Sequence, residues 1–201
     1  MKSKLVLFDV GNVLVDCREV ESIRRDIAKE VGLRNLNIFN NPKFNTSYGN
    51  EFDSYLFYHL VGEAKSCGPE KFKEVYSKHL VRLPWYDDVI DVLSELQDVD
   101  DVKIGIFSDL CPMDFQNVKS KGILSMLDYR FLSYSLGSDK LDSRTYDMVE
   151  DITGYNGDDI IFLDDNEEIV NLAKSRGWDA ICVQGYDLDA ICEKLNSIWD
   201  Y

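Results

Sequence analysis

The 201-residue sequence has few zinc ligands and no long apolar segment. It contains two histidines and five cysteines, and no two cysteines form a CxxC pair, so a zinc cluster is not expected. The apolar run before Asp9 covers only four residues, which is too short for the core of a signal peptide, and no other run reaches membrane-spanning length. We therefore expect a soluble, cytoplasmic protein whose cysteines stay reduced.

Basic residues are also scarce. The chain has 22 Lys and Arg against 37 Asp and Glu, which gives a net charge of −15 and an isoelectric point near 4.5. This charge disfavours nucleic acid and anionic membranes as partners, and it leaves the oligomeric state open. A small anionic substrate would also be repelled, unless a metal ion or a well-placed cation reverses the field locally.

Apolar and aromatic residues, at 45% and 12% of the chain, are sufficient for a buried core in one domain with a modest insertion. Helical periodicity fills most of the intervals between five short apolar runs. Alternating strands and helices predict an α/β fold: a Rossmann-like three-layer α/β/α core with a parallel sheet. The five predicted strands are Leu5–Phe8, Lys103–Phe107, Tyr129–Tyr134, Asp159–Leu163 and Asp179–Val183.

One interval interrupts this alternation. Between Asp16 and Pro84 the patterns are helical only, and about seventy residues are far more than a strand-to-helix connection needs. We therefore predict a helical cap of residues 16–85, inserted after the first strand of a core made of residues 1–15 and 86–201. Aromatic spacing in this segment favours packing over substrate binding. The candidates for contact with substrate are Phe44, Tyr48, Phe52, His59 and, at the hinge, Trp85.

Charged and hydroxyl side chains follow the predicted strands, at the sheet edge where ligands bind in parallel folds. When each residue is considered alone, its simpler role is that of a helix N-cap or of a charge exposed to solvent. Together, their carboxylates would suit Mg²⁺, which prefers oxygen ligands. A carboxylate there can act as a nucleophile that forms an acyl phosphate, while a lysine offsets phosphoryl charge and a serine holds phosphate oxygens. The residues are Asp9, Ser108, Asp109, Lys140, Asp164 and Asp165.

At these positions the chain resembles the haloacid dehalogenase superfamily over nearly its full length. The four segments that carry the resemblance are Phe8–Asp16, Phe107–Asp109, Ser135–Tyr146 and Ile161–Asp165, the last followed by Ala173 and Gly177. Their order and spacing match the four motifs of that superfamily. The segment between the first two motifs is similar to the small helical cap of some members.

The resemblance implies a Mg²⁺-dependent phosphomonoester hydrolase that acts on a small phosphorylated metabolite through an aspartyl-phosphate intermediate. In this scheme Asp9 is the nucleophile and Lys140 assists it. Substrate phosphate is bound by Ser108 and Lys140, and Asp109 either faces the substrate or caps a helix. The metal is held by Asp9, Asp164, Asp165 and the carbonyl of Gly11.

Three positions depart from the usual pattern. Gly11 stands where most phosphatases of the superfamily carry a second Asp, and general acid–base assistance is worth a factor of about 10²–10⁴ in rate. Asn12 and Asp16 are local alternatives, although a turn residue and a helix N-cap are their simpler roles. Leu141 replaces a proline that would stiffen the lysine loop, and Ile169 replaces a common asparagine.

These departures leave several functions open. The Gly-Asn form also occurs in a bacterial branch that includes sugar-1-phosphate phosphatases. Anomeric and acyl phosphates are good leaving groups, so a sugar phosphate is one candidate substrate. A weakened or inactive member would instead act as a binding or regulatory protein. A 2-haloacid dehalogenase is a third reading, but that chemistry needs no metal and would leave Asp164 and Asp165 without a purpose.

Overall fold

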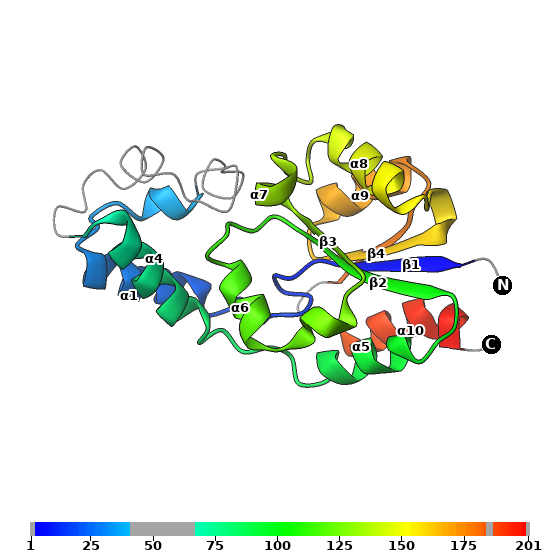
Figure 1. The fold of residues 1–201 in the computed structure, drawn as a ribbon, viewed down its shortest axis with the longest axis horizontal. Helices are drawn as coiled ribbons and strands as arrows, with labels where there is room; N and C mark the ends of the chain where they lie inside the picture. Colours follow the sequence, from blue (N-terminus) through cyan, green and yellow to red (C-terminus); the bar gives the residue numbers. More distant parts are fainter. Residues whose placement is uncertain (1–2, 41–66, 184–186, 200–201) are drawn as a thin grey trace.

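The computed structural model describes residues 3–40, 67–183 and 187–199. A parallel sheet of five strands in the order β3-β2-β1-β4-β5 forms the middle layer of these residues (Figure 1). The predicted α/β class and Rossmann-like architecture are thereby confirmed. The strands are β1 (Lys4–Phe8), β2 (Val102–Ser108), β3 (Tyr129–Leu132), β4 (Ile160–Asp164) and β5 (Asp179–Cys182).

Helices cover both faces of the sheet. The helices α5 (Val89–Gln97) and α10 (Leu188–Trp199) lie on one face, and α8 (Ser143–Thr153) and α9 (Glu167–Ser175) lie on the other (Figure 1). Alternate residues of β1 enter two separate hydrophobic clusters, Val6 and Phe8 in one and Leu5 and Leu7 in the other. Burial on both faces explains why β1 reads as a continuous apolar run.

The third predicted strand is wrong in its last two residues. The apolar run continues past Leu132, but Ser133 begins the short helix α7 (Ser133–Leu136). Gly137 closes this helix in the left-handed conformation, with φ of 71°, and its N–H donates to the carbonyl of Ser133 at 2.8 Å. The remaining short elements of the core are α6 (Phe115–Ser120), η2 (Ile123–Met126) and η3 (Gly157–Asp159).

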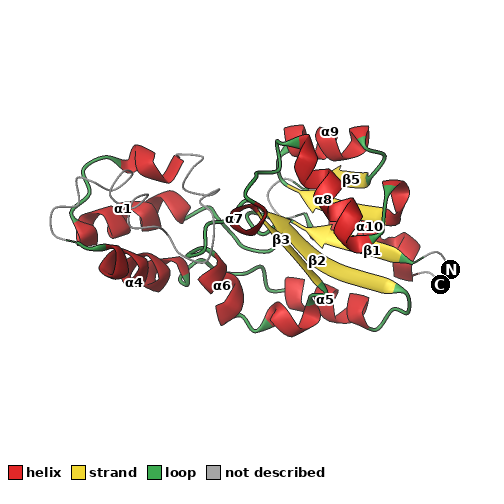
Figure 2. Cartoon of the chain, turned by 45° about the horizontal axis from the view of Figure 1, so that its top comes forward, coloured by secondary structure: helices red, strands yellow, loops and turns green. Residues whose placement is uncertain are grey.

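A helical layer lies beyond the carboxyl ends of the strands, to the left in Figures 1 and 2. It consists of α1 (Val20–Val31), η1 (Leu36–Asn40) and α4 (Pro69–Leu80), and α1 packs against α4 through buried apolar residues. Its position fits the expected cap, while the division into residues 16–85 and the two core segments stays a prediction. Four of the cap aromatics that the sequence singled out lie outside the described residues: Phe44, Tyr48, Phe52 and His59.

The two connections between cap and core run side by side. Val15 bridges Trp85 in an antiparallel pair, and the N–H of Asp16 donates to the carbonyl of Pro84 at 2.8 Å. The indole Nε1 of Trp85 donates to Oδ1 of Asn117 at 2.6 Å, so this tryptophan ties the hinge to the core. None of the helices in the described part of the chain has the length and apolar composition that crossing a membrane requires.

The suggested N-cap role of Asp16 is wrong. The residue that precedes α1 is Glu19, which makes no capping bond with its side chain. The carboxylate of Asp16 instead accepts hydrogen bonds from the N–H and the guanidinium of Arg18. These bonds lower the pKa of Asp16, and a carboxyl that stays ionised is a poor proton donor.

Candidate active site

A cavity of about 290 Å³ lies between the carboxyl edge of the sheet and the cap. Residues from β1, β2 and β4, or from the loops that follow them, form its floor. Parallel pairing aligns Phe8 with Ile106 and with Leu163, so the residues after these three strands meet at one edge. Trp85 does not line this cavity, whereas all the residues predicted to bind the metal or the phosphate do: Asp9, Gly11, Ser108, Asp109, Lys140, Asp164 and Asp165.

Lys140 is the central cation of the site. Its Nζ donates to Oδ1 of Asp9 and to Oδ2 of Asp164, both at 2.6 Å, and the residue is only 3% exposed. Burial alone would lower the pKa of Lys140, but the charges of the surrounding carboxylates outweigh it and hold the pKa above its ordinary value. Lys140 is therefore a permanent charge that joins the first and fourth strand ends.

Hydrogen bonds hold the loop that carries Lys140. The carboxylate of Asp109 accepts the backbone N–H of Lys140 at 3.1 Å. The hydroxyl of Ser138 donates to Asp142, which also caps α8 by accepting the N–H of Arg144. Leu141, which stands where a proline is usual, is 52% exposed. The loop is thus fixed through its flanks, without a proline.

The alternative role of Asp109 as a helix N-cap is wrong, since the next helix, α6, begins at Phe115 and is preceded by Asp114. Burial raises the pKa of Asp109 to about 6, against the opposing charge of Lys140. Asp109 therefore positions Lys140 and places a weakly acidic carboxyl in the cavity wall.

Three carboxylates could hold a metal ion. Oxygens of Asp9, Asp164 and Asp165 lie within 4.8 Å of one another. Burial, and next the charge of Asp9, raise the pKa of Asp164 to about 6, against the opposing charge of Lys140. Among the described residues, Oδ2 of Asp9 and Oδ1 of Asp165 accept no hydrogen bond. This all-oxygen donor set fits a hard divalent cation such as Mg²⁺.

Asn12 orients the third of these carboxylates. Its amide Nδ2 donates to Oδ2 of Asp165 at 2.8 Å, while its Oδ1 accepts the N–H of Cys17 at 3.3 Å. The backbone of Asn12 has a φ of 55°, a left-handed conformation that asparagine tolerates better than most residues. The turn role that the sequence suggested and a positioning role therefore fall on the same residue.

The position of Gly11 is open beside Asp9. A Cβ built there would lie 3.6 Å from Sγ of Cys17 and 3.8 Å from Oδ2 of Asp9, which are ordinary contact distances. Asp16, one of the two local alternatives, does not line the cavity, and Cys17 does. Burial raises the pKa of the Cys17 thiol to about 11, so this group is protonated at neutral pH.

Sequence reasoning missed the residues that the cap contributes to the cavity. They include Cys17 and Arg24, together with the aliphatic side chains Val20, Leu80 and Leu83. The available signal was helical spacing, because Arg24 lies one turn after Val20 on the same face of α1. The spacing alone does not predict which part of the core this face of α1 contacts.

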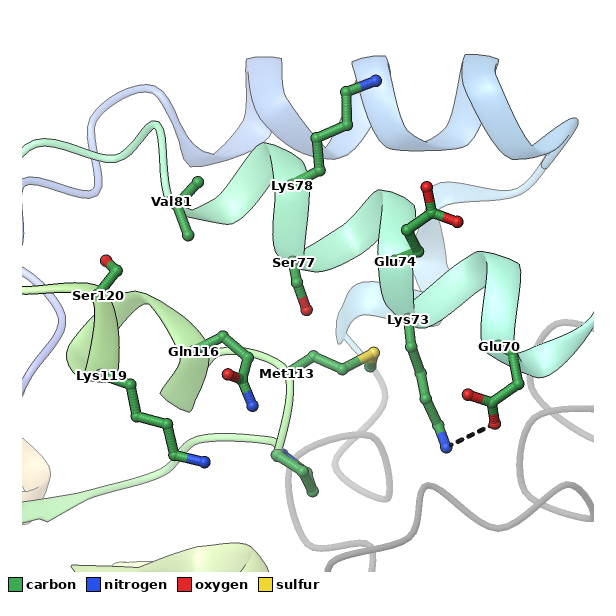
Figure 3. A pocket seen from close by; sticks show the side chains of 11 residues that line it. Glu70, Lys73, Glu74, Ser77, Lys78, Val81, Met113, Gln116, Lys119 and Ser120 are labelled. Atoms are coloured by element: carbon green, nitrogen blue, oxygen red, sulfur yellow. Dashed lines mark hydrogen bonds and ion pairs between the residues drawn. The ribbon is translucent and has the colours of Figure 1, made fainter.

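A second cavity, of about 750 Å³, lies between α4 and α6 (Figure 3). It shares no lining residue with the carboxylate cavity. Lys73 in its wall donates to Glu70 at 3.2 Å, and Lys78 pairs with Glu30 of α1 at 3.1 Å. The convergent carboxylates are in the smaller cavity, which we therefore treat as the functional site.

Comparison with solved structures identifies the fold. A predicted HAD-like family hydrolase from Porphyromonas gingivalis matches with a TM-score of 0.73 at 15% identity, over 97% of this chain and 98% of that one. A HAD family enzyme from Bacteroides thetaiotaomicron, in complex with magnesium and inorganic phosphate, matches with a TM-score of 0.70 at 16% identity, over 94% and 98%. The L-2-haloacid dehalogenase from Xanthobacter autotrophicus gives 0.64 at 20% identity, over 98% and 83%.

The chain therefore has the fold of the haloacid dehalogenase-like hydrolases, as its four motifs indicated. No protein-family model and no curated protein matches the sequence. The branch that includes sugar-1-phosphate phosphatases stays a prediction.

Proposed function

We propose that the protein is a Mg²⁺-dependent phosphomonoester hydrolase that acts on a small phosphorylated metabolite. The observation that carries this proposal is the buried Lys140, bound to both Asp9 and Asp164 beside Asp165. A cation enclosed by carboxylates is an arrangement that accepts a phosphoryl group once a metal ion is bound. A structural neighbour crystallised with magnesium and inorganic phosphate supports the same chemistry.

In this proposal Mg²⁺ would be held by the carboxylates of Asp9, Asp164 and Asp165 and by the carbonyl of Gly11. When bound, it supplies charge neutralisation between the nucleophile and the phosphate. Ser108, buried at the end of β2, would donate its hydroxyl to a phosphate oxygen, and Lys140 would add its positive charge.

Two displacements complete the reaction. First, a carboxylate oxygen of Asp9 attacks phosphorus as the bond from phosphorus to the ester oxygen breaks, and the leaving oxygen takes a proton from solvent. Water then attacks phosphorus, the bond to Asp9 breaks, inorganic phosphate leaves and the proton of water passes to solvent. Since Gly11 can transfer no proton, substrates with good leaving groups, such as anomeric or acyl phosphates, should react fastest.

The proposal is tested with a panel of sugar, acyl and aryl phosphates, assayed with Mg²⁺ and with EDTA. We expect turnover that requires Mg²⁺ and that Asp9→Asn abolishes, with a phosphorylated Asp9 trapped by acid quench and found by mass spectrometry. Asp147→Asn is the matched control, because Asp147 is an exposed carboxylate on α8 that pairs with Arg176. Turnover that survives both EDTA and Asp9→Asn would refute the proposal.

Two other functions are each favoured by one observation. The absence of an acid–base side chain at Gly11 favours a weakened or non-catalytic member that binds a phosphorylated ligand or a protein. Restoring Asp at position 11 separates this candidate from an active enzyme. The dehalogenase neighbour favours carboxylate attack on a carbon–halogen bond, which would appear as halide released from 2-chloropropionate in EDTA.

A further inference from the structure

The cap places one arginine in the wall of the active-site cavity. Of the described cap residues that line it, Val20, Leu80 and Leu83 are aliphatic, and Cys17 is a thiol that is neutral at pH 7. Arg24, on α1, is the charged member of this group. The described part of the cap therefore presents an apolar surface with one guanidinium to whatever occupies the cavity.

Contacts within the cap hold the Arg24 side chain in place. It is 22% exposed, its Cζ lies 5.7 Å from the centre of the Phe39 ring, and its Nη1 donates to Oε1 of Glu21 at 2.9 Å. Glu21 is 57% exposed, so this partner is largely solvated. A largely buried guanidinium binds an anion more strongly than a solvated one, because there is less water to screen the charges.

Lys140 is the second basic residue among the described lining residues, and it lies at the carboxylate end of the cavity. Lys140 bonds to Asp9 and Asp164. The carboxylate of Asp114, on the core wall, accepts hydrogen bonds from the hydroxyl of Tyr76 at 2.8 Å and from the N–H of Cys111 at 2.9 Å. At the phosphoryl end, Lys140 and a bound metal ion would balance the negative charge, while Arg24 carries a positive charge on the cap side.

We propose that the substrate carries a second anionic group, a carboxylate or a second phosphate, which Arg24 binds. This inference rests on the proposed function, because it places the reacting phosphate at Asp9. A short apolar stretch between the two anionic groups would pack against Val20, Leu80 and Leu83. Arg24 is then a specificity-determining residue of this site, and it discriminates against neutral phosphate esters.

The experiment compares matched ligands that differ only in the second group. The 3- and 4-carboxyphenyl phosphates are assayed beside the carbamoylphenyl phosphates, which have nearly the same size and are neutral at that position, and beside phenylene bisphosphates. The corresponding phosphonates, which are not hydrolysed, give dissociation constants by calorimetry in Mg²⁺. The protein variants are Arg24→Gln, Arg24→Lys and, as the matched control, Arg25→Gln, since Arg25 is exposed on the same helix.

We expect the wild type to prefer one charged isomer over its neutral counterpart by about 10- to 100-fold in kcat/KM and in affinity, the range for a charge-assisted hydrogen bond. Arg24→Gln should abolish this preference mainly through KM, Arg24→Lys should retain part of it, and Arg25→Gln should retain all of it. Whether the carboxyphenyl phosphate or the phenylene bisphosphate binds more tightly shows which second anionic group the site prefers.

Equal affinity of the wild type for charged and neutral phosphonates would overturn the inference. Loss of the preference in Arg25→Gln to the same degree as in Arg24→Gln would also overturn it, since the effect would then be one of general charge. If the phosphonates bind with a preference that depends on Arg24 and yet no phosphate ester is hydrolysed, the substrate inference stands and the proposed hydrolase activity fails.

Discussion

Replacing Gly11 by Asp tests most directly what would limit the rate of the proposed hydrolysis. The Cβ of the new residue would lie 3.6 Å from Sγ of Cys17 and 3.8 Å from Oδ2 of Asp9, so this atom fits at ordinary contact distances. The carboxyl would stand beside Asp9 and, in the proposed reaction, would donate a proton to the leaving oxygen. We expect kcat for alkyl phosphates to rise by up to about 10²–10⁴, and kcat for acyl or aryl phosphates to change little, because their leaving groups need little protonation.

The same substitution should also lower the free energy of unfolding. A fourth carboxylate beside Asp9, Asp164 and Asp165 adds repulsion of about 1–4 kcal/mol at these distances. The free energy of unfolding of Gly11→Asp should therefore fall in EDTA and recover in Mg²⁺. Gly11→Asn is the control, because its amide has the same size and transfers no proton. If Gly11→Asp is no faster than Gly11→Asn on alkyl phosphates, proton transfer at this position does not limit the rate, and the reasoning is refuted.

Three further predictions concern the residues around Asp9. Lys140→Met leaves Asp9 and Asp164 without their buried cation and should cost about 3–5 kcal/mol in urea unfolding, whereas Lys103→Met, in an exposed pair with Asp128, should cost at most about 1 kcal/mol. Asp109→Asn removes a carboxyl whose pKa the fold raises from 3.8 to about 6. Asn12→Ala frees the carboxylate of Asp165 and should weaken Mg²⁺ binding about 10- to 100-fold in calorimetry.

The sign of the Asp109 effect follows from the direction of its pKa shift. Because the folded protein holds this proton more tightly than the unfolded chain, Asp109 destabilises the fold as pH rises from about 4 to 6, by up to about 3 kcal/mol above pH 6. Asp109→Asn should therefore gain about 1–3 kcal/mol relative to the wild type between pH 4 and pH 7. A difference between the two proteins that does not vary with pH would contradict this.

Two results would count against the other predictions. Equal losses in Lys140→Met and Lys103→Met would mean that the buried ion pairs contribute no more than a surface pair. For Asn12, the control is Asn12→Gly, which tolerates the left-handed backbone and also lacks the amide. Mg²⁺ affinity that is low in Asn12→Ala but normal in Asn12→Gly would assign the effect to the backbone and not to Asp165.

The sequence predicted the sheet and its site residues for the same physical reason. Strands buried on both faces are nearly all apolar, so the first polar residue, such as Asp9, marks the point where the strand leaves the core. The end of β3 was mistaken because Ser133 and Tyr134 are also buried, and a short apolar run does not distinguish strand from helix. The burial of Ser133 and Tyr134 could be predicted from the sequence, but whether their backbone is extended or helical could not.

The residues that the cap contributes were not predictable in this way. Arg24, on α1, and Cys17, just before it, line the cavity because this part of the cap packs against the core, and that packing joins segments far apart in the sequence. The loop of Lys140 shows a related limit. Leu141 suggested a loose loop, whereas two hydrogen bonds, from the N–H of Lys140 to Asp109 and from the hydroxyl of Ser138 to Asp142, supply the restraint that the missing proline would have given.

The hinge side of the cap has a consequence for how ligands enter. Asn117, buried on α6, accepts the indole proton of Trp85 and donates to the carbonyls of Leu80 and Leu83, and it also lines the active-site cavity. A cap movement that keeps these bonds must turn about Asn117 as a pivot, so the gap would widen most at the part of the cap farthest from it. Because Asn117 lines the cavity, a ligand that contacts Asn117 would contact the residue about which the cap turns.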